Sequence, residues 1–424
     1  MIDIKLIREN PEKFKKAAKD KRIAIDIDEL LEVDAGLRKD KSQLQELTAE
    51  INRLGKSVPK LAETEKQKVL NELSEMKQKT TALDERVKEL QPKFDALILQ
   101  VAQPTDDDVP VGKDDTENVE IRKEGKVRQF DFEPKDHVQL GTSLDIIDIE
   151  RGVKLAGTRN YILKGDGAML HWAVLRFAVD FMAGRGYVPM SVPLLMKDET
   201  MTGTGFFPGS EDQTYRMEAD QLNLAGTAEV PLTAYRMDEI LKADELPLKF
   251  FAMSSCFRRE AGSAGKDTYG LYRIHQFDKV EQVVICENSI EQSNKFHEEI
   301  LANSEGVMAA LGLPYRVVMV CTGDLGRGQA KKYDIEAWMP SRKNYCETHS
   351  ASKFYEFQAR RMNLRYKDTA TKKNLFCHTL NNTVIASPRV LIPLLELYQN
   401  ADGSVTIPKV LRPYMGKEKI APRL

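Results

Sequence analysis

One segment of this chain, Lys249–Val284, combines residue types that could bind a phosphorylated ligand with a ring. An apolar run leads into Phe257-Arg258-Arg259-Glu260, a glycine-rich loop follows, and then comes the segment Leu271–Glu281. This order predicts two strands joined by a long loop. Alternate residues of a strand share a face, so Arg258 and Glu260 are expected to point the same way. The planar fork of an arginine suits a phosphate group.

The second predicted strand adds a ring and a carboxylate. Phe277, Lys279 and Glu281 stand at alternate positions and are therefore expected to share a face. A phenylalanine ring can stack on a base, and a carboxylate can pair with an ammonium group. An edge hairpin with ordinary ion pairs is the alternative. Gly265-Lys266 does not make the loop a P-loop, because Asp267 stands where that motif needs Ser or Thr.

Two heptad runs occupy the first hundred residues. In the first, apolar residues recur at steps of three and four from Leu30 to Leu54, and Asp40 breaks the pattern. In the second, from Val69 to Val101, the steps also alternate between four and three. This period is typical of a coiled coil.

Gly55 and Pro59 lie between the two runs and are expected to stop a helix. The sequence therefore predicts an antiparallel helical hairpin over about residues 30–101, roughly 40–60 Å long. Its outer positions carry charges of both signs, which is typical of a solvated face. A free-standing hairpin buries little surface and is expected to reach a partner protein or a nucleic acid; periodicity does not decide between them.

An acidic linker at Pro104–Asp108 ends the heptads and predicts two domains, 1–103 and 104–424. Beyond it, short apolar runs alternate with expected helices at His171–Gly184 and Ile290–Leu311. Strand pairs with hairpin spacing outnumber βαβ units, which predicts an α+β fold with an antiparallel sheet.

Composition excludes several classes of protein. The formal charge of the 424 residues is -2, so a uniform polyanion-coating surface is not expected. The five cysteines form no CxxC pair, which argues against a disulfide framework and a close-spaced zinc site. No run of about 18 apolar residues occurs, so we expect no membrane span and a cytoplasmic location.

The hairpin sequences Phe257-Arg258-x-Glu260 and His275-Gln276-Phe277-x-Lys279-x-Glu281 resemble motif 2 of the class II aminoacyl-tRNA synthetases, most closely the seryl-tRNA synthetase family. Further segments agree in chain order. Gly186–Pro193 resembles motif 1, Thr227-Ala228-Glu229 resembles the serine-binding loop of the family, and Asn382–Leu391 resembles motif 3. Each motif alone is weak, but the ordered set behind a helical arm is specific.

The resemblance implies roles for individual residues. Arg258 matches the arginine at the ATP α-phosphate and Arg389 the one at the γ-phosphate, and these two are the expected catalytic residues. The full expected ATP site comprises Arg258, Arg259, Glu260, Ile274, Phe277, Glu347, Thr348, His349, Ser350 and Arg389. Within it, Phe277 would stack on adenine, and Glu347 and Ser350 would hold Mg²⁺ with ATP. The expected serine site comprises Thr227, Ala228, Glu229, Glu281 and Thr383.

The resemblance also implies a reaction and its partners. The carboxylate of L-serine would attack the α-phosphorus of ATP, and seryl-adenylate would then pass its acyl group to the 3′ end of tRNA(Ser). The arm would lie along that tRNA and read its shape. A homodimer is implied through motif 1, which ends at Pro193. Whether tRNA(Sec) is also charged stays open.

Three residues depart from the family pattern. Asn382 and Val384 stand where the family has glycines, and we expect their side chains to narrow the serine pocket or shift its backbone. Pro393 falls in the expected motif 3 helix and predicts a kink.

Two other functions compete with aminoacylation. One is a synthetase-like paralogue that loads a carrier protein or only binds RNA; the other is a coiled-coil scaffold. Carrier-loading relatives lack the arm and hold zinc, for which this chain has no matching cysteines. A non-catalytic paralogue should have lost Arg258 and Arg389, and a scaffold would not need the second half.

Overall fold

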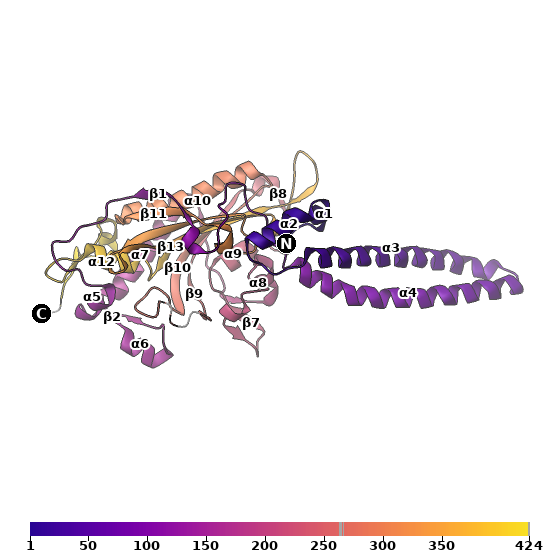
Figure 1. Ribbon diagram of the computed structural model, residues 1–424, viewed down its shortest axis with the longest axis horizontal. Coiled ribbons are helices and arrows are strands. Elements are labelled where there is room, and N and C mark those ends of the chain that lie inside the picture. Colours follow the sequence, from indigo (N-terminus) through magenta and orange to yellow (C-terminus); the bar gives the residue numbers. More distant parts are fainter. Residues whose placement is uncertain (263–264, 266, 423–424) are drawn as a thin grey trace. The chain divides into compact units, whose positions relative to one another are not determined.

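The computed structural model describes residues 1–262, 265 and 267–422 (Figure 1). Ser263, Ala264 and Lys266, which belong to the predicted glycine-rich loop, lie outside the described residues. The chain divides into two compact units, Met1–Pro104 and Thr105–Leu424. Each unit is described by itself.

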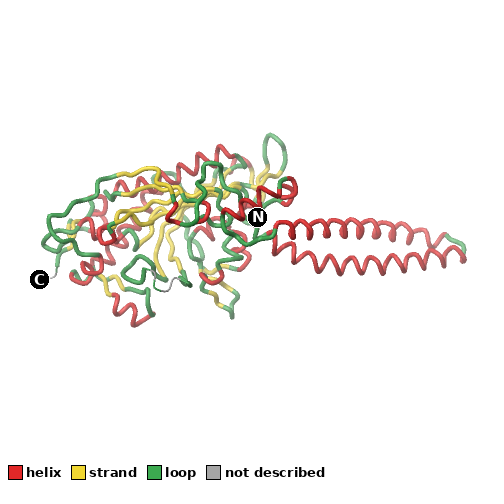
Figure 2. Tube along the Cα trace, in the orientation of Figure 1, coloured by secondary structure: helices red, strands yellow, loops and turns green. Residues whose placement is uncertain are grey.

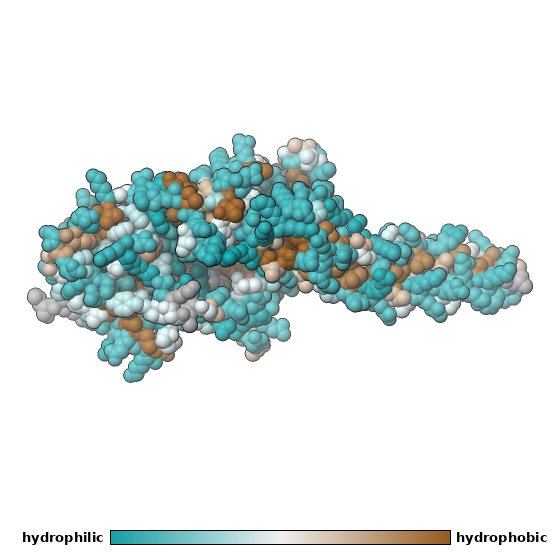
Figure 3. All heavy atoms as spheres, viewed as in Figure 1, coloured by the Kyte–Doolittle hydropathy of each residue, from teal (hydrophilic) through white to brown (hydrophobic). Residues whose placement is uncertain are grey.

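The first unit is entirely helical. Two short helices, α1 (Ile4–Glu9) and α2 (Pro11–Asp20), precede two long ones, α3 (Ile27–Ser57) and α4 (Glu63–Ile98). The long helices lie side by side and are about 46 and 54 Å long, within the predicted range (Figures 1 and 2). Helix α3 continues through Gly55, and the chain reverses after the 3₁₀ turn that contains Pro59. The visible face of both long helices is mostly hydrophilic (Figure 3).

Polar contacts across the two long helices define their antiparallel register. Lys93 Nζ lies 2.8 Å from Glu29 Oε1, and Lys41 Nζ donates to Gln91 Oε1 at 2.6 Å. Asp40, which breaks the heptad pattern, is fully buried between the helices. Its carboxylate accepts no hydrogen bond from the described residues, and Arg86 of α4 lies 3.2 Å away. The interface between α3 and α4 therefore contains an enclosed charge, Asp40, whose counter-ion Arg86 extends to it from the exposed surface of α4.

The second unit is built on one large sheet. Eight strands follow the order β1-β11-β12-β13-β16-β10-β9-β4, and all neighbours are antiparallel except β4 and β9. Their bounds are β1 (Val119–Glu124), β4 (Val188–Pro189), β9 (Leu248–Phe257), β10 (Gln276–Cys286), β11 (Tyr315–Met319), β12 (Lys331–Met339), β13 (Asn344–Tyr355) and β16 (His378–Ser387). The predicted α+β fold with an antiparallel sheet is confirmed.

Helices cover one face of this sheet. The main hydrophobic core lies between the sheet and the helices α7 (Asp166–Ala183), α10 (Ile290–Leu311) and α12 (Leu391–Tyr398). Helix α10 has the bounds expected from the sequence, and α7 begins five residues before the expected start at His171. The remaining helices of the unit are α5 (His137–Ser143), α6 (Ile149–Ala156), α8 (Asp198–Thr204), α9 (Glu229–Ala234), α11 (Phe357–Arg361) and α13 (Arg412–Met415).

Short strands form four small sheets around this centre. They are β2 (Ile147–Asp148) with β3 (Ile162–Leu163), β5 (Leu195–Met196) with β7 (Leu222–Leu224) and β6 (Arg216–Met217), β14 (Arg365–Lys367) with β15 (Asn374–Phe376) and β8 (Ile240–Lys242), and β17 (Val405–Thr406) with β18 (Lys419–Ile420). Among the described helices, none has the length and apolar character to cross a bilayer.

The side-chain alternation of β10 separates the core from the opposite face. Val280 and Val284 lie in the main core with α7 and α10. Val283 and Ile285 lie in a second cluster with residues of α9 and α11. Further along this second face, hydrophobic packing gives way to a polar cavity.

Two further sequence expectations about backbone shape are wrong, besides the expected helix stop at Gly55. Pro393 produces no lost bond, because it is the third residue of α12, where backbone N–H groups have no partner within the helix in any case. Glu260 does not share a strand with Arg258, because β9 ends at Phe257 and Glu260 has a left-handed φ of 52°. A turn, not strand alternation, therefore orients Glu260.

Candidate active site

A cavity of about 210 Å³ opens on the second face of the large sheet, the face on which α9 and α11 also pack. Its walls come from β10, β13 and β16, from the residues that follow β9, and from the segment that enters α12. Twelve of the fifteen predicted site residues line it: Thr227, Glu229, Arg258, Glu260, Ile274, Phe277, Glu281, Glu347, Thr348, Ser350, Thr383 and Arg389.

One part of the cavity presents an arginine and an aromatic ring together. The guanidinium of Arg258 lies 5.1 Å from the centre of the Phe277 ring, and its Nε donates to Gly226 O at 3.4 Å. Backbone bonds between Arg258 N and His275 O extend the β9–β10 pairing to this point. The pair thus offers a cation for an anionic group and a ring face for a base.

Glu260 is held in the same region by a second arginine. Arg273 Nη1 donates to Glu260 Oε2 at 2.7 Å, and both side chains line the cavity. The two residues stand on opposite arms of the loop that links β9 to β10. Their ion pair therefore joins the ends of that loop beside the cavity.

Arg389, from the segment that enters α12, also lines the cavity. Its Nη1 lies 3.3 Å from Glu347 Oε1 and donates to the Glu347 backbone carbonyl at 3.2 Å. Its Nε donates to Tyr272 O, and its guanidinium lies 4.6 Å from the centre of the Tyr272 ring. Enclosure raises the pKa of the Glu347 carboxyl, but Arg389, Lys332 and Arg258 outweigh it and lower that pKa overall. Glu347 is therefore held ionised.

The floor of the cavity contains a buried ion pair. Lys279 and Glu281, on the same face of β10, contact each other directly. Lys279 Nζ also donates to Thr227 Oγ1 at 2.7 Å, and Thr383 Oγ1 donates to Glu281 Oε2 at 3.2 Å. These four side chains form one small polar cluster with two hydroxyls, an ammonium and a carboxylate. A cluster with charges of both signs suits a zwitterionic ligand.

Glu229, at the start of α9, adds a second carboxylate here. Gln358 Nε2 donates to its Oε1 at 2.9 Å. Burial, and then the nearby charge of Glu281, raise the pKa of Glu229 to about 7. The carboxyl is therefore poised between its neutral and charged forms near neutral pH, an environment common in functional sites.

Three predicted site residues do not line the cavity. The Ala228 side chain is buried in the cluster around α9 and α11. Arg259 is exposed, and its backbone N–H donates to Gln213 O. His349 is buried beside Thr348, whose Oγ1 lies 2.7 Å from His349 Nδ1, and burial lowers the pKa of His349 to about 3. This histidine is neutral and is enclosed in the protein.

The expectation that Asn382 and Val384 narrow the pocket is also wrong. Asn382 Nδ2 donates to Ser304 Oγ and to Ile300 O of α10, and Val384 lies in the main core. Both side chains point to the helical face of β16, whereas their neighbours Asn381 and Thr383 line the cavity. Strand alternation at these positions turns the non-glycine side chains away from the ligand space.

Sequence reasoning missed several cavity residues. The alternation of β10 predicts that Lys279 shares a strand face with Phe277 and Glu281, but it indicates no role for Lys279, which is the most prominent of these residues. Arg273, Tyr272, Gln329, Ser352 and Asn381 also line the cavity, and their positions follow from pairing and turns that the sequence does not display.

The residues at the Glu347 wall fit a magnesium ion that accompanies a nucleotide. Glu347 and Ser350 provide a carboxylate and a hydroxyl that both line the cavity. Among the described residues, no group of three or more His, Cys, Asp or Glu side chains forms a metal cage. Mg²⁺ commonly takes one or two carboxylates and completes its shell with phosphate oxygens and water, so a sparse donor set suits it.

Comparison with known proteins agrees with the fold and the cavity. Residues 213–398 match the tRNA synthetase class II core domain (G, H, P, S and T), and residues 1–103 match the seryl-tRNA synthetase N-terminal domain. The serine–tRNA ligase of Deinococcus radiodurans is 46% identical over 420 residues, with 99% of each chain covered. That of Fervidobacterium nodosum is 43% identical, with 100% of each covered.

A solved structure is similar over the whole chain. The seryl-tRNA synthetase of Pyrococcus horikoshii complexed with ATP has a TM-score of 0.93 and 38% identity, and the match covers 100% of both chains. The antiparallel sheet and its polar cavity are those of a class II aminoacyl-tRNA synthetase core. The chain belongs to the seryl-tRNA synthetase family, as its motifs predicted.

Proposed function

We propose that this chain activates L-serine with ATP and transfers the seryl group to tRNA(Ser). The observation that carries the proposal is the arrangement of one cavity. Arg258, Phe277 and Arg389 surround space suited to a nucleotide, and the Lys279–Glu281 group adjoins it. Members of the family with this full-length match are serine–tRNA ligases.

In the first step, the serine carboxylate attacks the α-phosphorus and pyrophosphate leaves. We assign Arg258 to the α-phosphate and Arg389 to the γ-phosphate, where their charges offset the negative charge that develops. Phe277 stacks on adenine and Glu260 contacts its edge. Glu347 and Ser350 would hold Mg²⁺ with the phosphates, and the bound ion would supply further charge neutralisation. No side-chain nucleophile is required, because the enzyme aligns the two reactants.

Serine recognition is assigned to the floor of the cavity. Glu229 and Glu281 suit the ammonium group of serine, and Thr227 and Thr383 offer hydroxyls that can pair with its polar groups. Polar partners held ready for the serine hydroxyl would be left unpaired by alanine, which disfavours that amino acid. Threonine must be excluded by size.

The helical unit is assigned to tRNA binding. Its long hairpin, α3 with α4, has a mixed-charge surface, which suits recognition of RNA shape and backbone. Residues 1–103 form this tRNA-binding domain and residues 104–424 the catalytic domain. Charging of tRNA(Ser) and tRNA(Sec) transcripts side by side tests whether both are substrates.

A homodimer through motif 1 is part of the proposal. Strand β4 is the edge of the large sheet, and its Val188 is 53% exposed, as is Met253 of the neighbouring strand β9. Pro193 follows on the same exposed segment. Light scattering on the purified protein tests this, and a monomer mass would refute it. The described cysteines are all unpaired, which agrees with the proposed location in the cytoplasm.

The deciding experiment is serine-dependent ATP–pyrophosphate exchange, with threonine, alanine and cysteine as comparison substrates. We expect exchange with serine far above the other three. Exchange without serine preference would refute the proposal. Normal exchange with serine but no charging of tRNA would favour a paralogue that loads another acceptor.

A further inference from the structure

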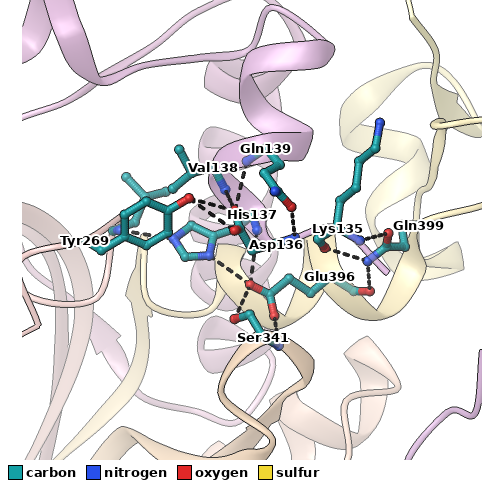
Figure 4. Close-up of polar contacts among 10 residues, drawn as sticks. Lys135, Asp136, His137, Val138, Gln139, Tyr269, Ser341, Glu396 and Gln399 are labelled. Carbon is teal, nitrogen blue, oxygen red and sulfur yellow. Dashed lines mark hydrogen bonds and ion pairs between the residues drawn. The ribbon is translucent and has the colours of Figure 1, made fainter. Parts of the chain in front are cut away.

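A buried polar cluster lies beside the cavity but outside its described lining (Figure 4). It joins His137, the first residue of α5, to Glu396 of α12 and to Ser341 in the 3₁₀ turn Pro340–Arg342. Glu396 is fully buried. Its carboxylate accepts from His137 N at 3.1 Å, from Ser341 N at 2.9 Å and from Ser341 Oγ at 2.8 Å.

The ring of His137 connects this carboxylate to the backbone of the motif 2 loop. Its Nδ1 lies 2.8 Å from Glu396 Oε1, and its Nε2 accepts from the backbone N–H of Leu271 at 3.2 Å. An accepting ring nitrogen has no proton. The imidazole is therefore neutral in this arrangement, with its proton on Nδ1, where it donates to Glu396.

The loop approaches this ring closely. Gly270 has a φ of 73°, and a Cβ at this position would lie 2.1 Å from His137 Nε2. On the other side, the Tyr269 hydroxyl donates to Asp136, the residue that caps α5, at 3.1 Å (Figure 4). The start of α5 therefore holds three consecutive loop residues, Tyr269–Leu271.

The next residues of the loop enter the cavity. Tyr272, Arg273 and Ile274 all line it. Tyr272 O accepts from Arg389, and the Tyr272 ring also lies 4.1 Å from the guanidinium of Arg342. Arg342 follows Ser341, which Glu396 holds directly. One buried carboxylate thus supports Tyr272 from two directions, through His137 and through Ser341.

We infer that His137 is a positioning residue for ATP binding. Oriented by Glu396, it fixes the backbone at Leu271, and that places Tyr272 against Arg389 and Arg273 against Glu260. His137 does not touch the reacting groups. The inference rests on the proposed function, because it takes the cavity as the ATP site.

Two substitutions of His137 test whether the residue positions the loop through its hydrogen bond or only fills space. The short amide of His137→Asn can still donate toward Glu396 but leaves nothing at the Nε2 position. The longer His137→Gln can place its amide oxygen there as an acceptor. We expect His137→Asn to raise the dissociation constant of Mg·ATP, measured by calorimetry, about 3- to 10-fold, the effect of one lost neutral hydrogen bond. His137→Gln should recover most of that loss.

The steady-state readout is the KM for ATP against the KM for serine in pyrophosphate exchange. We expect His137→Asn to raise the first and leave the second unchanged. His378→Asn is the matched control, because His378 is equally buried and pairs with Ser293 Oγ, away from the cavity. It should lower the melting temperature without changing either KM.

Several results would overturn the inference. If His137→Asn binds Mg·ATP as tightly as the unsubstituted protein, or raises both KM values equally, His137 is only a packing residue. If His137→Asn does not fold, Gly270→Ala tests the same contact, and unchanged ATP affinity in that variant would have the same meaning. If the unsubstituted protein itself does not bind Mg·ATP, the proposed function fails, which is a distinguishable outcome.

Discussion

The guanidinium of Arg389 lies 3.3 Å from the carboxylate of Glu347, although 42 residues separate the two in the chain. Each residue is the counter-ion of the other in the free cavity. We assign one to a phosphate and the other to the magnesium that accompanies it. Binding of Mg·ATP would then exchange one ion pair for two favourable contacts, so neither charge is left without a partner at any stage.

Replacing Arg389 with alanine should abolish most of the activation step. We expect serine-dependent pyrophosphate exchange to fall about 100- to 1000-fold, because a preorganised donor to the transition-state charge is lost. Arg412→Ala is a suitable control, since Arg412 forms an exposed ion pair with Glu418 and does not line the cavity. Normal exchange by Arg389→Ala would remove this residue from the site.

Substitutions in the Lys279–Glu281 pair should change the free energy of unfolding and the affinity for serine independently. Glu281→Gln leaves a buried ammonium without its counter-ion and should cost about 3–5 kcal/mol of unfolding free energy. The double variant Lys279→Met/Glu281→Gln should recover most of that stability, since the unpaired ammonium is removed as well. It should still not bind serine. Denaturant unfolding and the KM for serine measure the two effects, and a double variant with normal serine affinity would contradict the assignment.

Glu229 predicts a stability that depends on pH. Its pKa is raised from 4.5 to about 7, so the folded protein holds a proton there that the unfolded chain releases. This favourable contribution is complete below about pH 4.5 and disappears as the pH rises through 7. Glu229→Gln avoids the cost of the buried charge. We expect it to be about 1–3 kcal/mol more stable than the unsubstituted protein at pH 8, with the difference shrinking toward pH 5.

The same variant should weaken serine binding at pH 8, because a carboxylate assigned to the serine ammonium is gone. Urea unfolding at pH 5, 7 and 8 gives the stability difference. A difference that stays constant over this range would show that Glu229 does not titrate there.

Deleting residues 30–101 tests the assignment of the hairpin to tRNA. The catalytic unit has its own hydrophobic core, so serine-dependent pyrophosphate exchange should be retained. Charging of tRNA(Ser) should be lost, because the segment assigned to binding it is absent. Equal loss of both activities would contradict this division of labour.

Patterns with a strict period were the most predictable from the sequence. The heptads gave the two long helices to within a few residues, and α10 has the bounds expected. Phe277 and Glu281 lie on one strand face, as their spacing requires. These features depend on local chain geometry, so a single sequence displays them.

Features set by turns and by pairing were not predictable in the same way. Glu260 reaches the cavity by a left-handed turn after the strand has ended. The register of β12 against β13 shifts between Ile335 and Glu336. Because of this irregularity, Glu347 and His349 do not share an environment although they stand two residues apart: Glu347 lines the cavity and His349 is buried. The support of Leu271 by His137 spans 134 residues and leaves no periodic trace.

Replacing the buried Asp40 with an apolar residue should stabilise the hairpin but leave the alignment of its two helices less well defined. Asp40→Leu fills the interface between α3 and α4 with apolar volume and removes an enclosed charge, so we expect about 1–4 kcal/mol more stability in the helical unit. Arg86→Ala should do the opposite, because Asp40 then has no nearby cation. Thermal unfolding followed by circular dichroism compares the two. A stability loss in Asp40→Leu would show that the ion pair is net stabilising.

The position of Asp40 has a consequence for the reach of the hairpin. A repeat of seven residues permits α3 and α4 to slide past each other by one repeat, about 10 Å, with most apolar contacts re-formed. A slide by one repeat would replace Arg86 beside the enclosed charge by Lys79 or Lys93, and lysine lacks the planar fork of the arginine that pairs with Asp40 in the native alignment. The enclosed acid between α3 and α4 therefore favours one alignment of the two helices, which would give the hairpin a constant span against the tRNA that we propose it binds.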